Sequence, residues 1–191
     1  MIEDFIKLVT QIFPSISPYI AQQAMNSVKD FLRRGQEIQM LEPEPFEDLA
    51  QGDVISNLYF TFIDNNANEI ELNTMGMLLS NTCDAHNRNQ ILFAPLIHLE
   101  EIGRAGIDIG ALKRNLIYRI FYINSKPLAD FVIDFSIVSS YSRELIWKMQ
   151  RKGHIHKVSS LSRFGFYFLI AKLNVFLLRP EDPDFNKGRS V

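Results

Sequence analysis

The sequence predicts an α+β fold in which a β-rich, barrel-like centre is framed by helices at both ends. Three observations predict it. Apolar residues recur at helical spacing over residues 1–35, strand-like runs alternate with turn clusters over residues 52–136, and helical spacing returns from residue 143. At 191 residues and 47% hydrophobic, the chain is long enough to bury a core without disulfide bonds.

Residues 1–35 predict a helical hairpin. The first helix is indicated by apolar residues at helical spacing, namely Ile2, Phe5, Ile6, Val9 and Phe13. Pro14 ends it. The second helix starts with Ser17 as N-cap and Pro18 at the first helical position, and it ends before Gly35. This amphipathic hairpin is expected to dock onto a partner, onto a second copy of the chain, or over the β-rich centre as a lid.

Residues 36–51 predict an extended acidic linker, because Pro43 and Pro45 lie among five acidic residues. If the linker folded back over the basic half of the chain, it would compete there with nucleic acid. We expect four parts in the chain: the helical hairpin (1–35), the acidic linker (36–51), a barrel-like domain with C-terminal helices (52–178) and a polar tail (179–191).

Six strands are expected after residue 52, at residues 54–63, 69–72, 76–80, 90–96, 117–123 and 128–135. Turn-forming residues at 64–68 and 124–127 make hairpins of the first and last pairs. The near-continuous apolar strands indicate a sheet that is buried on both faces or rolled into a barrel. A short helix is expected at 107–116.

Two helices are expected towards the C-terminus. One spans residues 143–151 and is ended by Gly153. The other is capped by Ser160 or Ser162 and runs to about Leu178, before Pro180. Its aromatic start, residues 164–168, is expected to lie in the core, because it leads into a strongly apolar helix.

The net charge of −2 divides unevenly along the chain, with −10 over residues 1–101 and +8 over the remainder. Either the basic half has an anionic partner, or the two halves form oppositely charged solvated surfaces. The single cysteine fits a reducing compartment. No basic leader opens the chain, and no apolar run reaches the roughly 20 residues of a bilayer span. We therefore expect a cytoplasmic protein without membrane contact.

The polar segment between the strands at 76–80 and 90–96 concentrates reactive side chains. His86 and Arg88 provide a base and a cation, the groups needed to activate a ribose hydroxyl and to neutralise a developing phosphorane. Thr82 would hydrogen-bond phosphate, and Asp84 completes the candidate catalytic set. The alternative is that these polar residues are turn formers that satisfy local backbone groups.

A zinc site is a further alternative for the same segment. Cys83, Asp84 and His86 are side chains of the types that bind zinc, and His98, His154 and His156 lie elsewhere in the chain. Their spacing matches no common structural zinc motif. We therefore predict no metal and no cofactor. A buried thiol is the commoner role for a lone cysteine.

A second candidate surface is the basic stretch from residue 143 to 163. Its cations and histidines are Arg143, Lys148, Arg151, Lys152, His154, His156, Lys157 and Arg163. Lys and Arg bind phosphates without sequence preference, and His or Phe side chains stack on exposed bases. These residues therefore form the predicted nucleic-acid-binding set. The alternative is an ordinary basic surface helix with the stems of its side chains lying over a core.

Three short motifs resemble the PemK/MazF toxin family. They are Gly52-Asp53-Val54, the strand Gly76-Met77-Leu78-Leu79-Ser80-Asn81, and Ile91-Leu92-Phe93-Ala94-Pro95-Leu96. The match covers residues 52–97. The resemblance implies a small SH3-like barrel, a homodimer and a metal-independent endoribonuclease of a toxin–antitoxin system. It also implies that the partners are RNA and a protein such as an antitoxin.

The chain departs from that family at two places. The family's Arg-Pro pair is replaced by residues 73–75, and its threonine after the third motif by Ile97 or His98. Either His86, His98 or Arg88 takes the catalytic role, or the barrel is a binding platform. The sequence therefore predicts a PemK/MazF-like protein that engages RNA, with an endoribonuclease toxin as its concrete form. The alternative is a non-catalytic nucleic-acid-binding or protein-interaction module of a bacterial or phage-related defence system.

Overall fold

The computed structural model of the chain describes residues 18–34, 38–64 and 66–178. The first expected helix (residues 2–13) and the polar tail (179–191) lie outside the described residues. Helices and antiparallel strands together build the described part, which confirms the predicted α+β class. Within the ranges described, no helix combines the length and apolar character needed to cross a bilayer.

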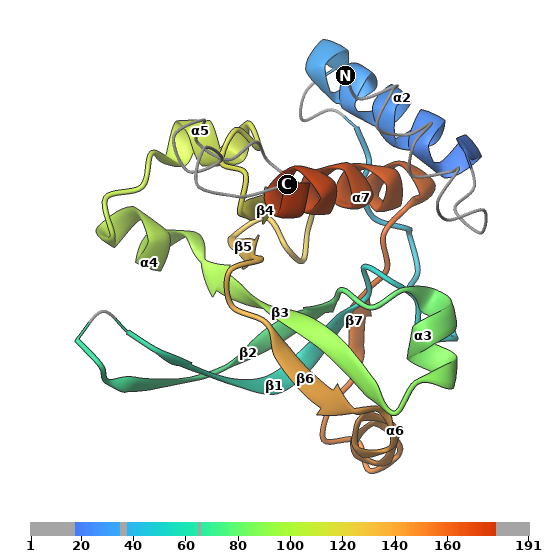
Figure 1. Cartoon of the computed structure of the whole chain (residues 1–191), viewed down its shortest axis with the longest axis vertical. Helices are drawn as coiled ribbons and strands as arrows, with labels where there is room; N and C mark the ends of the chain where they lie inside the picture. The colour runs from blue at the N-terminus through green and yellow to red at the C-terminus, as the bar shows by residue number, and fades with distance from the viewer. Residues whose placement is uncertain (1–17, 35–37, 65, 179–191) are drawn as a thin grey trace, which may run out of the picture.

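The strands of the described residues form one antiparallel sheet (Figure 1). The strands are β1 (Val54–Ile63), β2 (Glu69–Leu78), β3 (Gln90–His98), β4 (Ile120–Tyr122), β5 (Phe131–Asp134), β6 (Ser139–Ser142) and β7 (Lys157–Ser159). They pair in the order β4-β5-β3-β2-β1-β7, and β6 pairs with β3. β3 is central, since its first half pairs with β6, its middle with β2 and its last residues with β5.

The β1–β2 hairpin follows the expected alternation of a half-buried strand pair. Leu58 and Phe60 are buried, whereas Tyr59 and Thr61 point to solvent. Asp64 closes the predicted turn, because its Oδ1 accepts hydrogen bonds from the backbone N–H groups of residues 66 and 68, both at 2.8 Å. This pairing holds the long hairpin in register.

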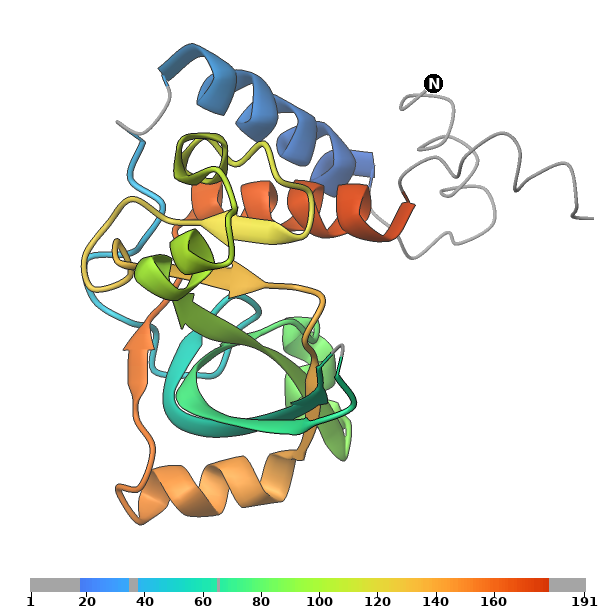
Figure 2. The same cartoon turned by 90° about the vertical axis from the view of Figure 1, so that its left-hand side faces the viewer.

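Helices lie at both ends of the strands, and α3 lies beside them (Figures 1 and 2). They are α2 (Pro18–Arg34), α3 (Thr82–Asn87), α4 (Leu99–Arg104), α5 (Ile109–Lys113), α6 (Arg143–Arg151) and α7 (Arg163–Leu178). α2 and α7 lie side by side over one end of the strands, and α6 lies at the other. α2, α6 and α7 agree with the predicted helices. α3 replaces the expected polar turn. α5 lies within the helix expected at 107–116 but is shorter, and α4 was not predicted.

Three hydrophobic clusters fill the part of the molecule that the structure describes. The largest joins α2 and α7 to the strands and contains Phe31, Phe121 and Phe168. A second lies inside β1, β2 and β3 and is covered by Ala85 of α3 and Ile146 of α6. The third holds α4 and α5 against β4 and β5. The aromatic start of α7 therefore enters the core as predicted, with Phe168 buried.

The segment expected to be a linker is packed from residue 38 onwards. Ile38, Met40, Leu41 and Leu49 are all buried. Leu41 forms an antiparallel bridge with Leu161, which precedes α7. The acidic residues around Pro43 and Pro45 are mostly exposed, but these four apolar side chains fix the chain on both sides of them. From residue 38, this segment is therefore part of the packed body.

Candidate nucleic-acid interface

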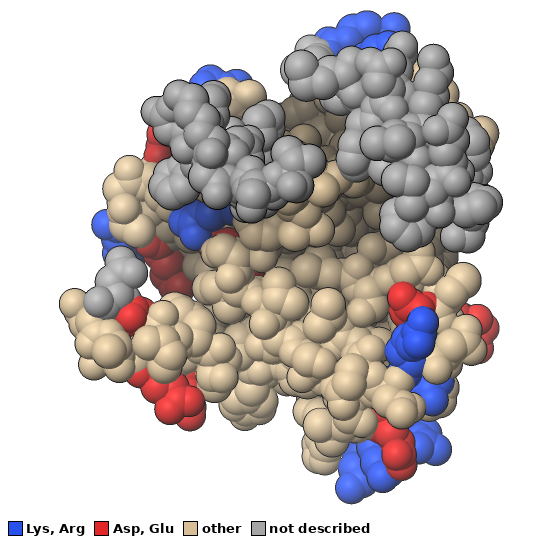
Figure 3. Space-filling model, in the orientation of Figure 1, with Lys and Arg blue, Asp and Glu red and all other residues tan. Residues whose placement is uncertain are grey.

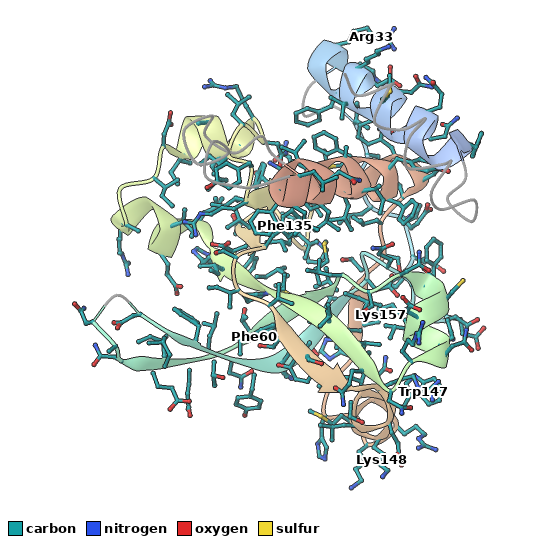
Figure 4. The ribbon with its side chains drawn as sticks, in the orientation of Figure 1. Arg33, Phe60, Phe135, Trp147, Lys148 and Lys157 are labelled. Atoms are coloured by element: carbon teal, nitrogen blue, oxygen red, sulfur yellow. The ribbon has the colours of Figure 1, made fainter. Side chains whose placement is uncertain are left out.

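α6 presents a basic surface because most of its lysine and arginine side chains lie on the side of the helix away from the buried Ile146. Ser142 caps the helix, with its Oγ accepting from the N–H of Leu145, and Ile146 is buried on the inner side. Lys148 and Arg151 point outward, and Lys152 follows as the C-cap. Gly153 then leaves the helix with φ +72°. Figure 4 shows Lys148 at the outer surface of the helix.

Trp147 is an exposed aromatic side chain on the same helix. It retains 39% of its accessible surface. The guanidinium carbon of Arg143, one turn earlier, lies 4.6 Å from the centroid of the Trp147 ring. Arg143 also donates from Nη1 to the backbone carbonyl of His86. One cation thus orients the Trp147 ring and ties α6 to α3.

α3 lies beside the start of α6 and adds another exposed cation. The backbone N–H of Arg143 donates to the carbonyl of Asn89 at 3.0 Å, which places Arg88 next to the start of α6. The Arg88 side chain is 74% exposed. We define the α3–α6 face by its exposed or partly exposed residues, which are Arg88, Arg143, Trp147, Lys148, Arg151 and Lys152.

Two carboxylates offset part of this positive charge. Asp84 pairs with Arg88 at 3.2 Å, and Glu144 pairs with Lys148 at 2.8 Å. The hydrogen bond from Lys148 is the main reason why the pKa of Glu144 is lowered, so that Glu144 is ionised at neutral pH. Figure 3 shows Lys and Arg atoms gathered over the lower end of the molecule, with fewer Asp and Glu atoms among them. The face is therefore net positive.

The predicted catalytic residues lie together on or next to α3, where most already have partners. The Oγ1 of Thr82 accepts from the backbone N–H of Gln51 at 3.1 Å. The Nε2 of His86 lies 3.1 Å from the carbonyl oxygen of Leu49. Because a carbonyl only accepts, Nε2 carries the proton in this bond, and Nδ1 of a neutral imidazole is then an acceptor.

The predicted nucleic-acid-binding residues divide into two groups. Arg143, Lys148, Arg151 and Lys152 belong to the α3–α6 face, and the exposed His154 follows α6 directly. The other three lie elsewhere. His156 bonds through Nδ1 to the Oγ of Ser56 at 2.9 Å, and Arg163 is on α7, where it bonds to the hydroxyl of Tyr19.

Lys157 is in the second group because its amine is buried. Its Nζ lies 2.7 Å from Oδ2 of Asp53, and it donates to the backbone carbonyls of Phe46 and Asp48. Figure 4 shows Lys157 among the strands rather than at the outer surface. These contacts hold the acidic stretch at β7. Among the described residues, no ion pair joins a carboxylate of residues 42–48 to the α3–α6 face.

Trp147 is the functional candidate that sequence reasoning missed. A signal was present, since the chain has one tryptophan and it follows Arg143 by four positions, the spacing that brings side chains together on a helix. Cys83 is exposed rather than buried. In the described ranges, no three His, Cys, Asp or Glu side chains are grouped so that they could hold a metal ion.

Comparison with known proteins finds similarity in structure but not in sequence. No family model matches the sequence, and no curated protein matches it. Among solved structures, the crystal structure of MazE–MazF (form II) from Deinococcus radiodurans is similar over 71% of this chain and 100% of that chain. The identity is 10% and the TM-score is 0.41.

Proposed function

We propose that this chain is a PemK/MazF-like protein with an SH3-like barrel that engages single-stranded RNA through the α3–α6 face. The observation that carries the RNA-binding part is the exposed Trp147 ring set among Arg88, Lys148, Arg151 and Lys152. Cations neutralise phosphates, and an aromatic ring stacks on an unpaired base. Single-stranded RNA offers both groups at once, whereas a duplex hides its bases in the stack.

The barrel part of the proposal is supported by where the family-like motifs lie. Residues 52–97 contain β1, β2 and β3, which are consecutive and antiparallel. β7 pairs with the start of β1, and β6 pairs with β3. Between β6 and the far part of β1, the hydroxyl of Tyr141 donates to the carbonyl of Tyr59. This side-chain contact stands where a barrel would close.

The binding mode can be tested by fluorescence anisotropy with a labelled single-stranded RNA over a series of salt concentrations. Replacing both Arg151 and Lys152 with alanine is expected to weaken binding and to make the salt dependence shallower by about 1 to 2 in slope. The matched control replaces Arg33 and Arg34, two exposed arginines of α2 at the opposite end of the molecule. Equal losses in both variants would contradict the proposed location.

Trp147 separates stacking from simple charge attraction. Trp147→Ala is expected to weaken single-stranded RNA binding by roughly tenfold, because stacking of one base contributes about 1 to 3 kcal/mol. It should leave the salt slope unchanged, since no cation is removed. Binding of RNA duplex should change little. An unchanged single-strand affinity would exclude Trp147 as a stacking platform.

Metal-independent RNA cleavage is the second candidate, favoured by the geometry of His86. The protonated Nε2 faces Leu49, so Nδ1 is the acceptor available to take the proton of a ribose 2′-hydroxyl. The 2′-oxygen would then attack the adjacent phosphate to form a 2′,3′-cyclic phosphate and expel the 5′-oxygen of the next nucleotide, which takes a proton from water. Arg88, on the same short segment, would stabilise the negative charge of the phosphorane, with Asp84 and Thr82 beside it.

Cleavage is tested by incubating single-stranded RNA with the protein in EDTA. Wild-type protein is expected to cut, His86→Ala to be inactive, and the control variant with alanine at Arg33 and Arg34 to remain active. Intact RNA at high protein concentration would exclude the enzyme. Binding without cleavage would then support the non-catalytic binding module, and the absence of any RNA binding would favour a protein-interaction role. A homodimer and an antitoxin-like protein are the expected protein partners of the toxin form.

A further inference from the structure

A cavity of about 200 Å³ lies at the end of the molecule opposite α6. α2, α7 and the chain after α5 form its walls. Most of the lining side chains are apolar: Val28, Phe31, Leu116, Phe168, Ala171 and Val175. Two cationic residues, Arg114 and Lys172, line the same space. None of these residues belongs to the α3–α6 face, so the cavity is independent of the proposed RNA interface.

Lys172 is the unusual member of this lining. It is only 7% exposed, although lysine is almost never buried without a partner. Its Nζ donates to the carbonyls of Asn115 and Ile117, at 3.0 and 2.6 Å. An ammonium has three N–H donors, and these two bonds account for two of them. The carbonyls follow α5, so Lys172 also fixes the chain there to α7.

The charge of Lys172 lacks a carboxylate in the part of the chain that the structure describes. The ion pairs within the described ranges involve other residues, and both contacts of Nζ are to neutral carbonyls. Burial of a cation is unfavourable unless an anion compensates it. Arg114 adds a second positive group at the same cavity and none of these ion pairs includes it. The site is therefore electrostatically complementary to an anion.

We propose that this cavity binds a small monocarboxylate with an apolar body. The carboxylate has one charge and two acceptor oxygens, which suit the remaining N–H of Lys172 and the guanidinium of Arg114. A phosphate is disfavoured because most of its oxygens would lie against aliphatic and aromatic side chains that offer no donor. The apolar body is required because the walls are formed by aliphatic and aromatic side chains.

The size of the cavity limits the ligand. A cavity of about 150 Å³ in another protein holds benzene. A volume of about 200 Å³ therefore suits a ligand of roughly eight to ten heavy atoms, well below the drug-sized molecules that fill pockets of about 300 Å³ or more. Hexanoate has this size, and 1-hexanol is a neutral molecule of nearly the same shape.

The test is isothermal titration of the full chain with hexanoate and, separately, with 1-hexanol. Hexanoate is expected to bind wild-type protein at least roughly tenfold more tightly than 1-hexanol, because a charge-assisted hydrogen bond to Lys172 is lost with the alcohol. Lys172→Met should weaken hexanoate binding by roughly tenfold and leave 1-hexanol binding nearly unchanged, with Arg114 still in place. Lys126→Met, which removes an exposed lysine between β4 and β5, is the matched control and should bind both ligands as wild type does.

A second variant keeps the test decisive if Lys172→Met fails to fold. Val175 is 53% exposed and lines the cavity, so Val175→Trp would fill the space and leave Lys172 in place. Its expected result is loss of hexanoate binding. Three results would overturn the site: no hexanoate binding at millimolar concentration, equal affinity for hexanoate and 1-hexanol, or hexanoate affinity that Val175→Trp leaves unchanged.

Discussion

Lys157 Nζ lies 2.7 Å from Asp53 Oδ2, with 9% of the lysine side chain and 1% of the aspartate side chain exposed. This ion pair joins β7 to the residue before β1. The same Oδ2 accepts from the backbone N–H of Ala50 at 2.8 Å, while Oδ1 is buried without a hydrogen-bond partner. Asp53, part of the family-like Gly-Asp-Val motif, therefore has a structural role in this chain.

Removing the amine of Lys157 is expected to destabilise the protein strongly. Lys157→Met would leave the buried Asp53 carboxylate without its cation, a change that typically costs about 3 to 5 kcal/mol of unfolding free energy. Lys148→Met removes an exposed pair and should cost less than about 1 kcal/mol. Chemical denaturation of both variants measures the difference. A small effect at Lys157 together with a loss of RNA affinity would restore it to the nucleic-acid-binding set.

Gly165 tests whether the segment before β1 is packed against α7. A Cβ at Gly165 would lie 2.2 Å from the backbone oxygen of Met40, too close to be accommodated without movement of that chain. Gly to Ala within a helix normally stabilises by up to about 1 kcal/mol. Here Gly165→Ala is expected to destabilise instead, by at least about 1 kcal/mol.

The control for this prediction is Gly103→Ala in α4. A Cβ there would meet Ile109 at 3.5 Å, an ordinary contact distance, so the substitution should be neutral or stabilising. Thermal unfolding of the two variants gives the comparison. If both glycines behave alike, the segment around Met40 does not lie against α7 as the structure has it.

The parts of the fold that are bounded by proline, glycine or turn-forming residues could be predicted from the sequence. Pro18, Gly153 and Pro180 bound helical patterns, and α2, α6 and α7 lie close to the expected ranges. The turn cluster that begins at Asp64 also indicated the β1–β2 hairpin, but the two strands expected at 69–72 and 76–80 are one continuous strand, β2. In these segments, local signals and tertiary packing favour the same structure.

Segments whose conformation depends on contacts with distant parts of the chain were predicted less well from the sequence. Residues 36–51 read as a linker because of Pro43, Pro45 and the acidic side chains, yet Met40 and Leu49 are buried by elements distant in the chain. α3 was expected to be a turn, since Asn81 favours turns and caps equally. The Oδ1 of Asn81 accepts from the N–H of Cys83, and this cap begins α3, a helix of only six residues.

The candidate site, too, could be predicted from the sequence only in part. The basic character of α6 could be read from composition, but which lysines reach solvent could not. Lys148 and Lys157 have the same charge and lie nine positions apart, and only the fold buries one of them. The exposed position of Trp147 likewise depends on which side of α6 covers the strands.

The contact between Tyr141 and the carbonyl of Tyr59 gives a prediction about the link between β6 and β1. Burial raises the pKa of Tyr141 to about 12, so the hydroxyl is protonated and can donate at neutral pH. Its ring packs edge-on against Phe60 and Phe93. Tyr141→Phe would keep the ring and remove only the donor, so we expect a loss of about 1 kcal/mol in unfolding free energy.

Tyr59→Phe is the control for this contact. The Tyr59 side chain is 63% exposed and its backbone carbonyl is unchanged by the substitution, so stability should change by less than about 0.5 kcal/mol. Hydrogen exchange locates the effect, because amides of β1 should exchange faster in Tyr141→Phe alone. Unchanged exchange in β1 would show that the hydroxyl does not hold the two strands together.

The buried amine of Lys172 predicts a rise in stability with pH. Burial lowers its pKa from 10.5 to about 8 in the folded protein. Between these two values the unfolded chain binds more protons than the folded chain, so the free energy of unfolding increases as pH rises. From pH 8 to 9.5 the gain is expected to be on the order of 1 kcal/mol. Arg114, the other cation at the cavity, is present in wild-type protein and in the Lys172→Met variant, so it does not cause a difference between their pH profiles.

Denaturant unfolding of wild-type protein and Lys172→Met across this range measures the gain. The variant lacks the titrating amine and should show a flatter profile, although its overall stability also changes because the carbonyls of Asn115 and Ile117 lose their donor. The slope, rather than the absolute stability, therefore reports the buried charge. Parallel profiles would mean that the amine has the same pKa in the folded and unfolded chains, and would remove the electrostatic reason for an anion at this cavity.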